Sequence, residues 1–171
     1  MNAAQLSPSE YLPFYSNYVK TAGLVDLISG LEVGLKNTSA FFESIPEEKL
    51  EYQYADSKWT VKEIIQHLID AERVFTYRAL RFARQDATPL QGFEENSYAT
   101  ASFANSRSRE SLIEEYGASR QSTLHMFKSF SDAMLMKVGV ASGGEMSVRA
   151  IGFVIIGHEA HHCNIIKERY L

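Results

Sequence analysis

The spacing of apolar residues along the chain predicts four long amphipathic helices and little β-structure. In the first segment, from about Thr21 to Glu43, apolar residues such as Leu24 recur three and four positions apart. It ends before Pro46, which cannot donate the next helical hydrogen bond. The second helix has the sharpest start, because Thr60 and Glu63 have the spacing of a capping box. It is expected to end near residue 84.

The third helix is expected from about Ser108 to Phe130, and a looser glycine-containing link follows it. Ser147 is a candidate N-cap for the fourth helix, which runs almost to the C-terminus. Four amphipathic helices in one small domain bury their apolar stripes economically as a four-helix bundle. The predicted fold class is therefore all-α.

A polar connector from Gln85 to about Arg107 separates the second and third helices. Its length of about 23 residues exceeds that of a tight helix–helix turn. When extended it reaches roughly 75 Å, about twice the length of a helix of that size, so the third helix can start at either end of the bundle. Long loops often carry function, so Asn96 and Tyr98 are candidates for a lid.

Composition narrows the class of protein. The chain has 171 residues with 45% hydrophobic and 12% aromatic residues, which suits one globular domain spanning residues 1–171 and excludes general disorder. With 17 Lys and Arg against 21 Asp and Glu, no nucleic-acid partner is expected. No signal peptide, no membrane-spanning segment and a single cysteine, Cys163, predict a cytoplasmic protein without a membrane partner.

Three of the five histidines fall in one run near the C-terminus. On a helical wheel of about 100° per residue, His158 and His162 share the buried face, whereas His161 is expected to face outward. Burying two imidazoles is unfavourable unless their nitrogens find partners, and a metal ion satisfies both. A third ligand has to come from another helix. His67, on the inner flank of the second helix, is the candidate.

Hydrogen-bonded core histidines are the competing interpretation, and the spacing alone leaves both open. His125 is expected to face solvent and Cys163 to act as a packing residue. Glu159 is expected to point away from His158 and His162. His162 is taken to lie one residue too late for the His-Glu-x-x-His motif, so the run is not expected to act as a zinc-protease motif.

Three segments together carry a resemblance to a known family: residues 58–73, residues 77–80 and residues 157–162. They combine a Trp-led helix with an internal His, a long connector, and two His four residues apart on the last helix. The chain resembles the DinB-like family of bacterial metal-binding four-helix bundles. The resemblance implies an up-down-down-up bundle with a long crossover between its second and third helices. It also implies one divalent metal on His67, His158 and His162, and a homodimer.

Characterised relatives in that family include transferases and isomerases that use low-molecular-weight thiols such as bacillithiol or mycothiol. An open three-histidine site is the catalytic pattern, and such a metal lowers the pKa of a bound water or thiol. Zinc and nickel both suit imidazole ligands. We therefore expect a metal-dependent enzyme acting on a small molecule, foremost a bacillithiol-dependent type of thiol S-transferase. A metal-dependent hydrolase, a non-catalytic metal-binding or interaction bundle, and a bundle without metal are the alternatives.

Two polar residues on the expected inner faces have open roles, and no catalytic residue is identified. Arg120 lies on the third helix's apolar stripe, where it needs an anion: Glu72 or Asp70, or a substrate carboxylate. Asp70 is a candidate acceptor for a ligand imidazole. A surface ion pair of Asp70 with Arg73 or Arg78 is the equally good alternative.

Overall fold

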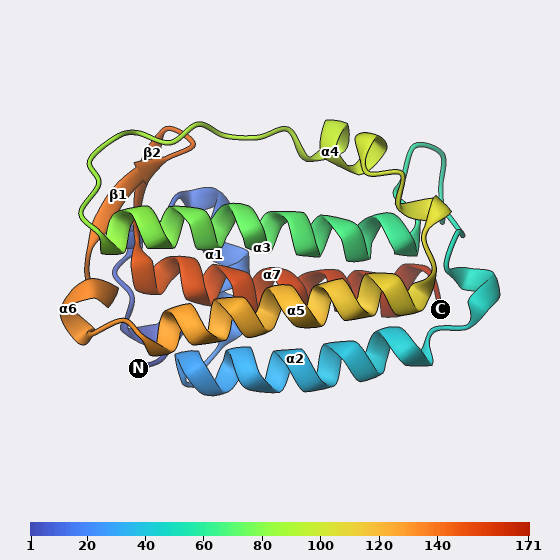
Figure 1. Ribbon diagram of the computed structural model, residues 1–171, viewed down its shortest axis with the longest axis horizontal. Helices are drawn as coiled ribbons and strands as arrows, with labels where there is room; N and C mark the ends of the chain where they lie inside the picture. Colours follow the sequence, from blue (N-terminus) through green and yellow to red (C-terminus); the bar gives the residue numbers. More distant parts are fainter.

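A computed structural model describes all 171 residues and shows the four expected long helices packed as a bundle (Figure 1). These helices are α2 (Leu27–Ser44), α3 (Val61–Ala83), α5 (Arg109–Lys128) and α7 (Val148–Arg169). The smaller elements are α1 (Ser16–Ala22), α4 (Glu95–Ala101), α6 (Asp132–Leu135), β1 (Val138–Ala141) and β2 (Gly144–Ser147). Short 3₁₀ turns lie at Ala3–Gln5, Pro8–Glu10, Pro13–Tyr15, Glu47–Lys49 and Ala104–Ser106.

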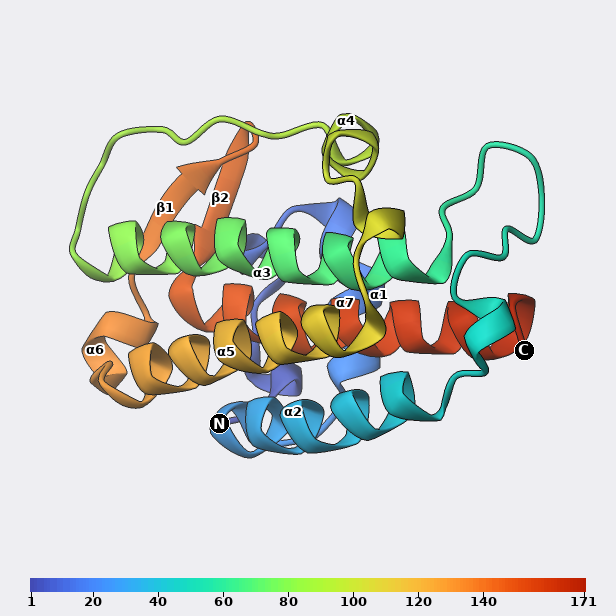
Figure 2. The same ribbon diagram turned by 45° about the vertical axis from the view of Figure 1, so that its right-hand side comes forward.

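The connector between α3 and α5 crosses the length of the bundle. In Figure 1, α2 and α7 run in one direction, and α3 and α5 run in the other. The chain therefore has to return from the end of α3 to the opposite end of the bundle before α5 begins. It does so along the outside of α3, and it carries α4 on the way (Figure 2).

The N-terminal helical region differs from the sequence prediction, which placed one helix from about Thr21 to Glu43. The structure has two helices, because Gly23 ends α1 with a positive φ of 65° and Asp26 caps α2. The Asp26 carboxylate accepts hydrogen bonds from the next helix's first-turn N–H groups. Leu24, expected on a buried stripe, falls in the break between the helices and is 76% exposed.

The starts of the other long helices agree with the sequence prediction. The Thr60 hydroxyl accepts from the Glu63 N–H at 3.1 Å, and the Glu63 carboxylate accepts from the Thr60 N–H at 2.7 Å. Ser108 caps α5 and Ser147 caps α7 through their hydroxyls. Side-chain caps satisfy N–H groups that have no partner inside the helix, so these positions are fixed locally.

A β-hairpin replaces the predicted glycine-containing link, so the fold is not purely helical. Strands β1 and β2 pair antiparallel, with Val138 opposite Ser147. Ser142 and Gly143 form the turn with φ of 53° and 83°, the backbone that a two-residue hairpin with the native twist requires. Leu90 of the connector bonds to the hairpin on both sides, through its N–H to the Val140 carbonyl and its carbonyl to the Ser142 N–H.

Two apolar clusters hold the bundle together. The larger contains Leu31, Phe127 and Ile151, and the smaller contains Phe42 and Ile65, all of which are fully buried. Removing these apolar side chains from water makes the main favourable contribution to the free energy of folding. None of the helices combines the length and the apolar character needed to cross a bilayer.

Candidate metal centre

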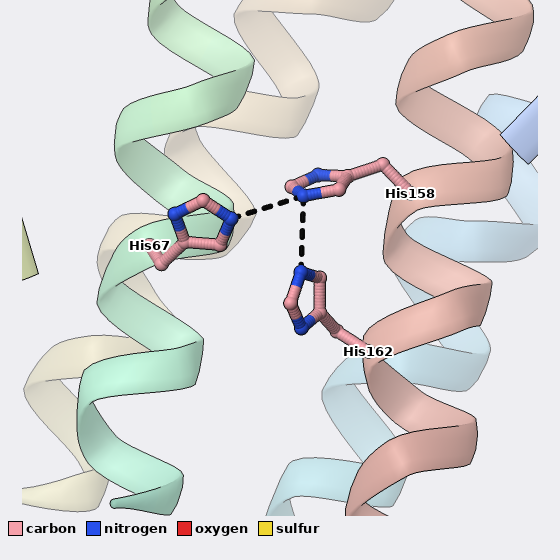
Figure 3. Close-up of side chains that lie close together, drawn as sticks. All are labelled: His67, His158 and His162. Atoms are coloured by element: carbon pink, nitrogen blue, oxygen red, sulfur yellow. Dashed lines mark hydrogen bonds between the residues drawn. The ribbon is translucent and has the colours of Figure 1, made fainter. Parts of the chain in front are cut away.

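The three histidines singled out in the sequence meet between α3 and α7 (Figure 3). His67 comes from α3, and His158 and His162 come from successive turns of α7. The Nε2 atom of His158 lies 3.0 Å from that of His67 and 3.1 Å from that of His162. All three ligand atoms lie within 4.8 Å of one another.

This spacing fits a single metal ion. Zinc–imidazole bonds are about 2.0–2.1 Å long, so two nitrogens at tetrahedral or right angles around the ion lie roughly 2.9–3.4 Å apart. The His67–His158 and His158–His162 Nε2 separations, 3.0 and 3.1 Å, fall in that range. No other side chain that could serve as a ligand joins the group. Without an ion, the same two contacts are hydrogen bonds between the imidazoles, so the geometry suits both a shared metal ion and a hydrogen-bonded histidine cluster.

Burial keeps the three imidazoles neutral. It lowers the pKa of His67 to about 4 and that of His162 to about 3, and the neighbouring imidazoles add to the effect at His162. The pKa of His158 is held well below its ordinary value, again chiefly by burial. A neutral imidazole keeps the lone pair that a metal needs. At neutral pH the site is therefore in its metal-binding form.

Aromatic rings that were not predicted as site residues hold the imidazoles in place. The Trp59 ring lies 4.6 Å from the His67 ring, and the Tyr18 ring lies 5.1 Å from the His158 ring, centroid to centroid. Trp59 directly precedes the capping box of α3, so the start of that helix positions it. In the sequence, Tyr18 was visible only as part of an aromatic N-terminal segment.

Two cavities adjoin the histidines and share Trp59 and His162. The first, of about 140 Å³, contains all three histidines in its wall together with an aromatic lining. Its aromatic residues are Phe14, Tyr15, Tyr18, Trp59, Phe75 and Phe93. The second, of about 280 Å³, is more polar and includes Lys58 and Asn96. The site is therefore reached from two sides.

The two lid candidates, Asn96 and Tyr98, and His161 differ in whether they line one of these cavities. Asn96 lines the second cavity, whereas Tyr98 lines neither and packs against Phe93 with ring centroids 5.0 Å apart. His161 is half-buried beside Tyr18 and also lines the second cavity. The expectation that His161 simply faces outward was wrong, although it stays outside the cluster of three.

Asp70 does not support an imidazole. Its carboxylate accepts a hydrogen bond from the Gln66 amide at 3.0 Å and lies 3.8 Å from the Arg73 guanidinium. The predicted acceptor role for Asp70 was therefore wrong, and the alternative pairing with Arg73 is the one present. Arg78 bonds elsewhere, to the Gln91 carbonyl and the Ser142 hydroxyl.

Arg120 is paired with carboxylates of the protein itself. The sequence alone had left open whether its partner is a protein carboxylate or a substrate carboxylate. Its guanidinium makes two hydrogen bonds of 2.8 Å to the Glu72 carboxylate, and a third of 2.6 Å to Glu159. The Tyr116 hydroxyl also donates to Glu159. Burial by itself lowers the pKa of Arg120, yet the two carboxylates raise it well above its ordinary value. No free guanidinium is left for a substrate carboxylate.

The same pairing fixes the role of Glu159. The expectation that His162 lies one residue too late was wrong, because His158, Glu159 and His162 do have the His-Glu-x-x-His spacing of zinc proteases, in which the glutamate is the general base. Here Glu159 points away from the histidines, as predicted, and is committed to Arg120 and Tyr116. It is therefore not available as a base at the candidate metal site.

The remaining histidine and the cysteine behave as expected. His125 is exposed on α5. Cys163 is buried, with its thiol 3.9 Å from the Thr38 hydroxyl, and burial raises the pKa of that thiol to about 11. It stays protonated at neutral pH, as befits a packing residue rather than a ligand.

Comparison with known proteins agrees with the fold. No curated protein matches the chain. Among solved structures, YfiT from Bacillus subtilis, described as a probable metal-dependent hydrolase with an unusual four-helix bundle topology, has a TM-score of 0.77. The match has 14% sequence identity and covers 95% of this chain and 90% of that chain, so it shows the shared fold. The model of the DinB superfamily matches residues 31–166, which include all three histidines. The chain therefore belongs to the DinB superfamily.

Proposed function

We propose that the protein is a metal-dependent enzyme in which His67, His158 and His162 hold one divalent ion, zinc or nickel. The observation that carries the proposal is the convergence of three neutral Nε2 atoms beside a cavity. Structural zinc sites are closed by four protein ligands, whereas three ligands leave a position for a reactant. A divalent ion supplies a Lewis acid there, which lowers the pKa of a nucleophile that binds to it.

The surrounding residues favour a thiol as that nucleophile. Asp70 is engaged with Gln66, and Glu159 with Arg120 and Tyr116, so Glu95 is the one free carboxylate in the cavity wall. A thiol whose pKa is lowered becomes a thiolate, which attacks without further help from a protein base. We therefore favour S-transfer from a low-molecular-weight thiol such as bacillithiol to a small electrophile, with a new carbon–sulfur bond formed as the leaving group departs.

Metal-dependent hydrolysis is the second candidate. The description of YfiT as a probable hydrolase motivates it, and an open three-histidine site also suits activation of water. The aromatic wall beside the histidines offers apolar contacts to an organic thiol and its electrophile, which favours the thiol instead. A bundle that binds metal or a partner without turnover is the third possibility.

Metal content tests the first step. Protein is stripped with a chelator, reloaded with zinc or nickel, desalted and analysed for metal. We expect one ion per chain in wild type, and an affinity at least about tenfold weaker in His162→Ala, since even loss of a residue that only orients a ligand has effects of this size. His125→Ala is the matched control, because this histidine is exposed and distant in sequence from the cluster. Equal retention in all three proteins would rule out the site.

Turnover by the reloaded protein separates the candidate activities. Electrophiles are offered with bacillithiol or cysteine, and esters and amides are offered with water alone. Thiol consumption that depends on metal and is lost in His162→Ala supports the transferase. Metal-dependent cleavage without thiol supports the hydrolase. No turnover at full metal occupancy would favour the non-catalytic bundle.

A further inference from the structure

The cavity beside the histidines has an unusual wall for a metal site. Six aromatic side chains line it, from the N-terminal region, the loop before α3, α3 itself and the connector. Glu95 is the one residue in that lining with a full charge at neutral pH, and no Lys or Arg is present. Aromatic rings with a nearby carboxylate and no competing cation are the environment that binds organic ammonium groups.

The Glu95 carboxylate is free to meet such a group. It lies in the first turn of α4 and is exposed at the cavity. Its neighbour Glu94 caps that helix and bonds to Asn96 and Ser97, whereas Glu95 has no hydrogen bond or ion pair of its own. A first-turn carboxylate also interacts favourably with the helix dipole, but this does not require it to line a cavity.

The aromatic rings of the wall lie close to one another. The rings of Phe14 and Tyr15 each lie 6.3 Å from the Tyr18 ring, and the Tyr15 ring lies 5.8 Å from the Phe75 ring, centroid to centroid. Several electron-rich ring faces are therefore gathered in one wall of the cavity.

We propose that this aromatic cavity binds a small alkylammonium group of the substrate, held by the ring faces and by Glu95. The inference rests on the proposed function, since it places this group beside the nucleophile that the histidines would serve. A neutral apolar group would use the same rings, but it would gain no attraction from the charge of Glu95. The reacting molecule is therefore a small amine or quaternary ammonium compound with its electrophilic part near the histidines.

The sole tryptophan of the chain makes this binding measurable without any reaction. Trp59 lines the cavity, so changes in its fluorescence report on ligands there. Choline is the cationic probe, and dimethylbutanol, in which carbon replaces the choline nitrogen, is the neutral probe of the same shape. In fluorescence and calorimetric titrations we expect choline to bind at least about threefold more tightly, the lower range for a cation–aromatic contact. Equal affinity of the two probes would overturn the proposal.

Paired variants locate the binding. Glu95→Gln should remove most of the preference for choline, whereas Glu145→Gln, an equal charge change on β2, should leave it unchanged.

Phe14→Leu should also weaken the binding of choline more than that of the neutral probe. Its control is Phe103→Leu, because Phe14 and Phe103 are 71% and 75% exposed and only Phe14 lines the cavity. Unchanged choline affinity in both Glu95→Gln and Phe14→Leu would overturn the assignment.

The ligand class and the metal site are tested separately. The titrations are run on metal-free and on zinc-loaded protein, while metal content is measured separately. Selective choline binding without metal retention would refute the proposed function but keep the ligand class. Metal retention without choline selectivity would refute the ligand class and keep the proposed function.

Discussion

Arg120 shows how a single buried charge organises the interior behind the histidines. It is 1% exposed, and its partners Glu72 and Glu159 are 3% and 5% exposed. Such charges are tolerated only when each is paired and hydrogen-bonded. Glu159 directly follows His158 on α7, so the pairing also fixes the rotation of that helix face relative to α3 and α5.

Replacing Arg120 tests the energetic importance of this cluster. Arg120→Met should lower the free energy of unfolding by about 3–5 kcal/mol, because it leaves the buried Glu72 carboxylate without a partner and Glu159 with only the Tyr116 hydroxyl. Lys128→Met is the control, since its pair with Glu32 is about half exposed and should contribute at most about 1 kcal/mol. Urea denaturation of the metal-free proteins measures both. Similar losses in the two variants would contradict the interpretation.

The buried histidines predict a pH-dependent stability of the metal-free protein. The pKa of His67 falls from 6.5 to about 4 on burial, so between these values the unfolded chain binds a proton that the folded chain does not. The free energy of unfolding should therefore fall as pH drops from about 6.5 to about 4, by about 3 kcal/mol from His67 alone. Urea denaturation at a series of pH values measures this. His67→Gln should make the profile less steep, with His158 and His162 still contributing, and His125→Gln should leave it unchanged.

At the scale of single elements, the contact between α1 and α7 depends on Gly157. A Cβ atom at this position would lie 1.8 Å from the carbonyl oxygen of Tyr18, which is backbone and cannot rotate away. The glycine therefore lets the two helices approach closely enough for the Tyr18 ring to reach His158. Close approach of this kind is a common reason for glycine inside a helix.

Two glycine substitutions in long helices should have opposite effects. Gly157→Ala should lower the free energy of unfolding by about 1–3 kcal/mol, because it forces α1 away from α7. Gly117→Ala on α5 meets no atom within 4 Å and should raise it by roughly 0.5–1 kcal/mol through helix propensity. Thermal and urea denaturation measure both changes. A stabilising Gly157→Ala would show that the helices are not held at this distance.

The elements differ in how well local sequence predicts them. The starts of α3, α5 and α7 were predictable, because Thr60, Ser108 and Ser147 satisfy backbone groups within one turn. The helix end at Gly23 and the turn at Ser142 and Gly143 each have a local signal in the sequence, a glycine that can adopt a positive φ. The prediction followed the hydrophobic pattern instead and missed both. The pairing of the connector with the hairpin has no local signal, because it joins residues far apart in sequence.

At the scale of the whole molecule, the candidate metal would link α3 to α7. His67 and His158 are 91 residues apart in sequence but share one site. An ion that binds the folded protein and not the unfolded chain stabilises the fold by mass action. A metal ion bound there would therefore also be a stabilising link between two of the four long helices.

Zinc should raise the melting temperature accordingly. At a free zinc concentration of 100 times the dissociation constant, the folded state gains about 2.7 kcal/mol. Differential scanning calorimetry with and without zinc should show the increase in wild type and in His125→Ala. His162→Ala should lose most of it, since a ligand is missing. An equal increase in His162→Ala would place the bound zinc elsewhere.

The predicted homodimer concerns the whole molecule as well, and it stays a prediction. Analytical ultracentrifugation of the metal-loaded protein at several concentrations decides it. A species of twice the 19.3 kDa chain mass is expected.

The sequence by itself determined the four long helices, most of their starts, and the three histidines of the candidate site. These follow from periodicity and from capping, which act within a few residues. Only the tertiary structure decided that Trp59 and Tyr18 support the imidazoles, that Arg120 binds both Glu72 and Glu159, and that Glu95 faces an aromatic cavity. Such contacts join segments far apart in the chain, and their geometry depends on how whole helices pack rather than on any local pattern.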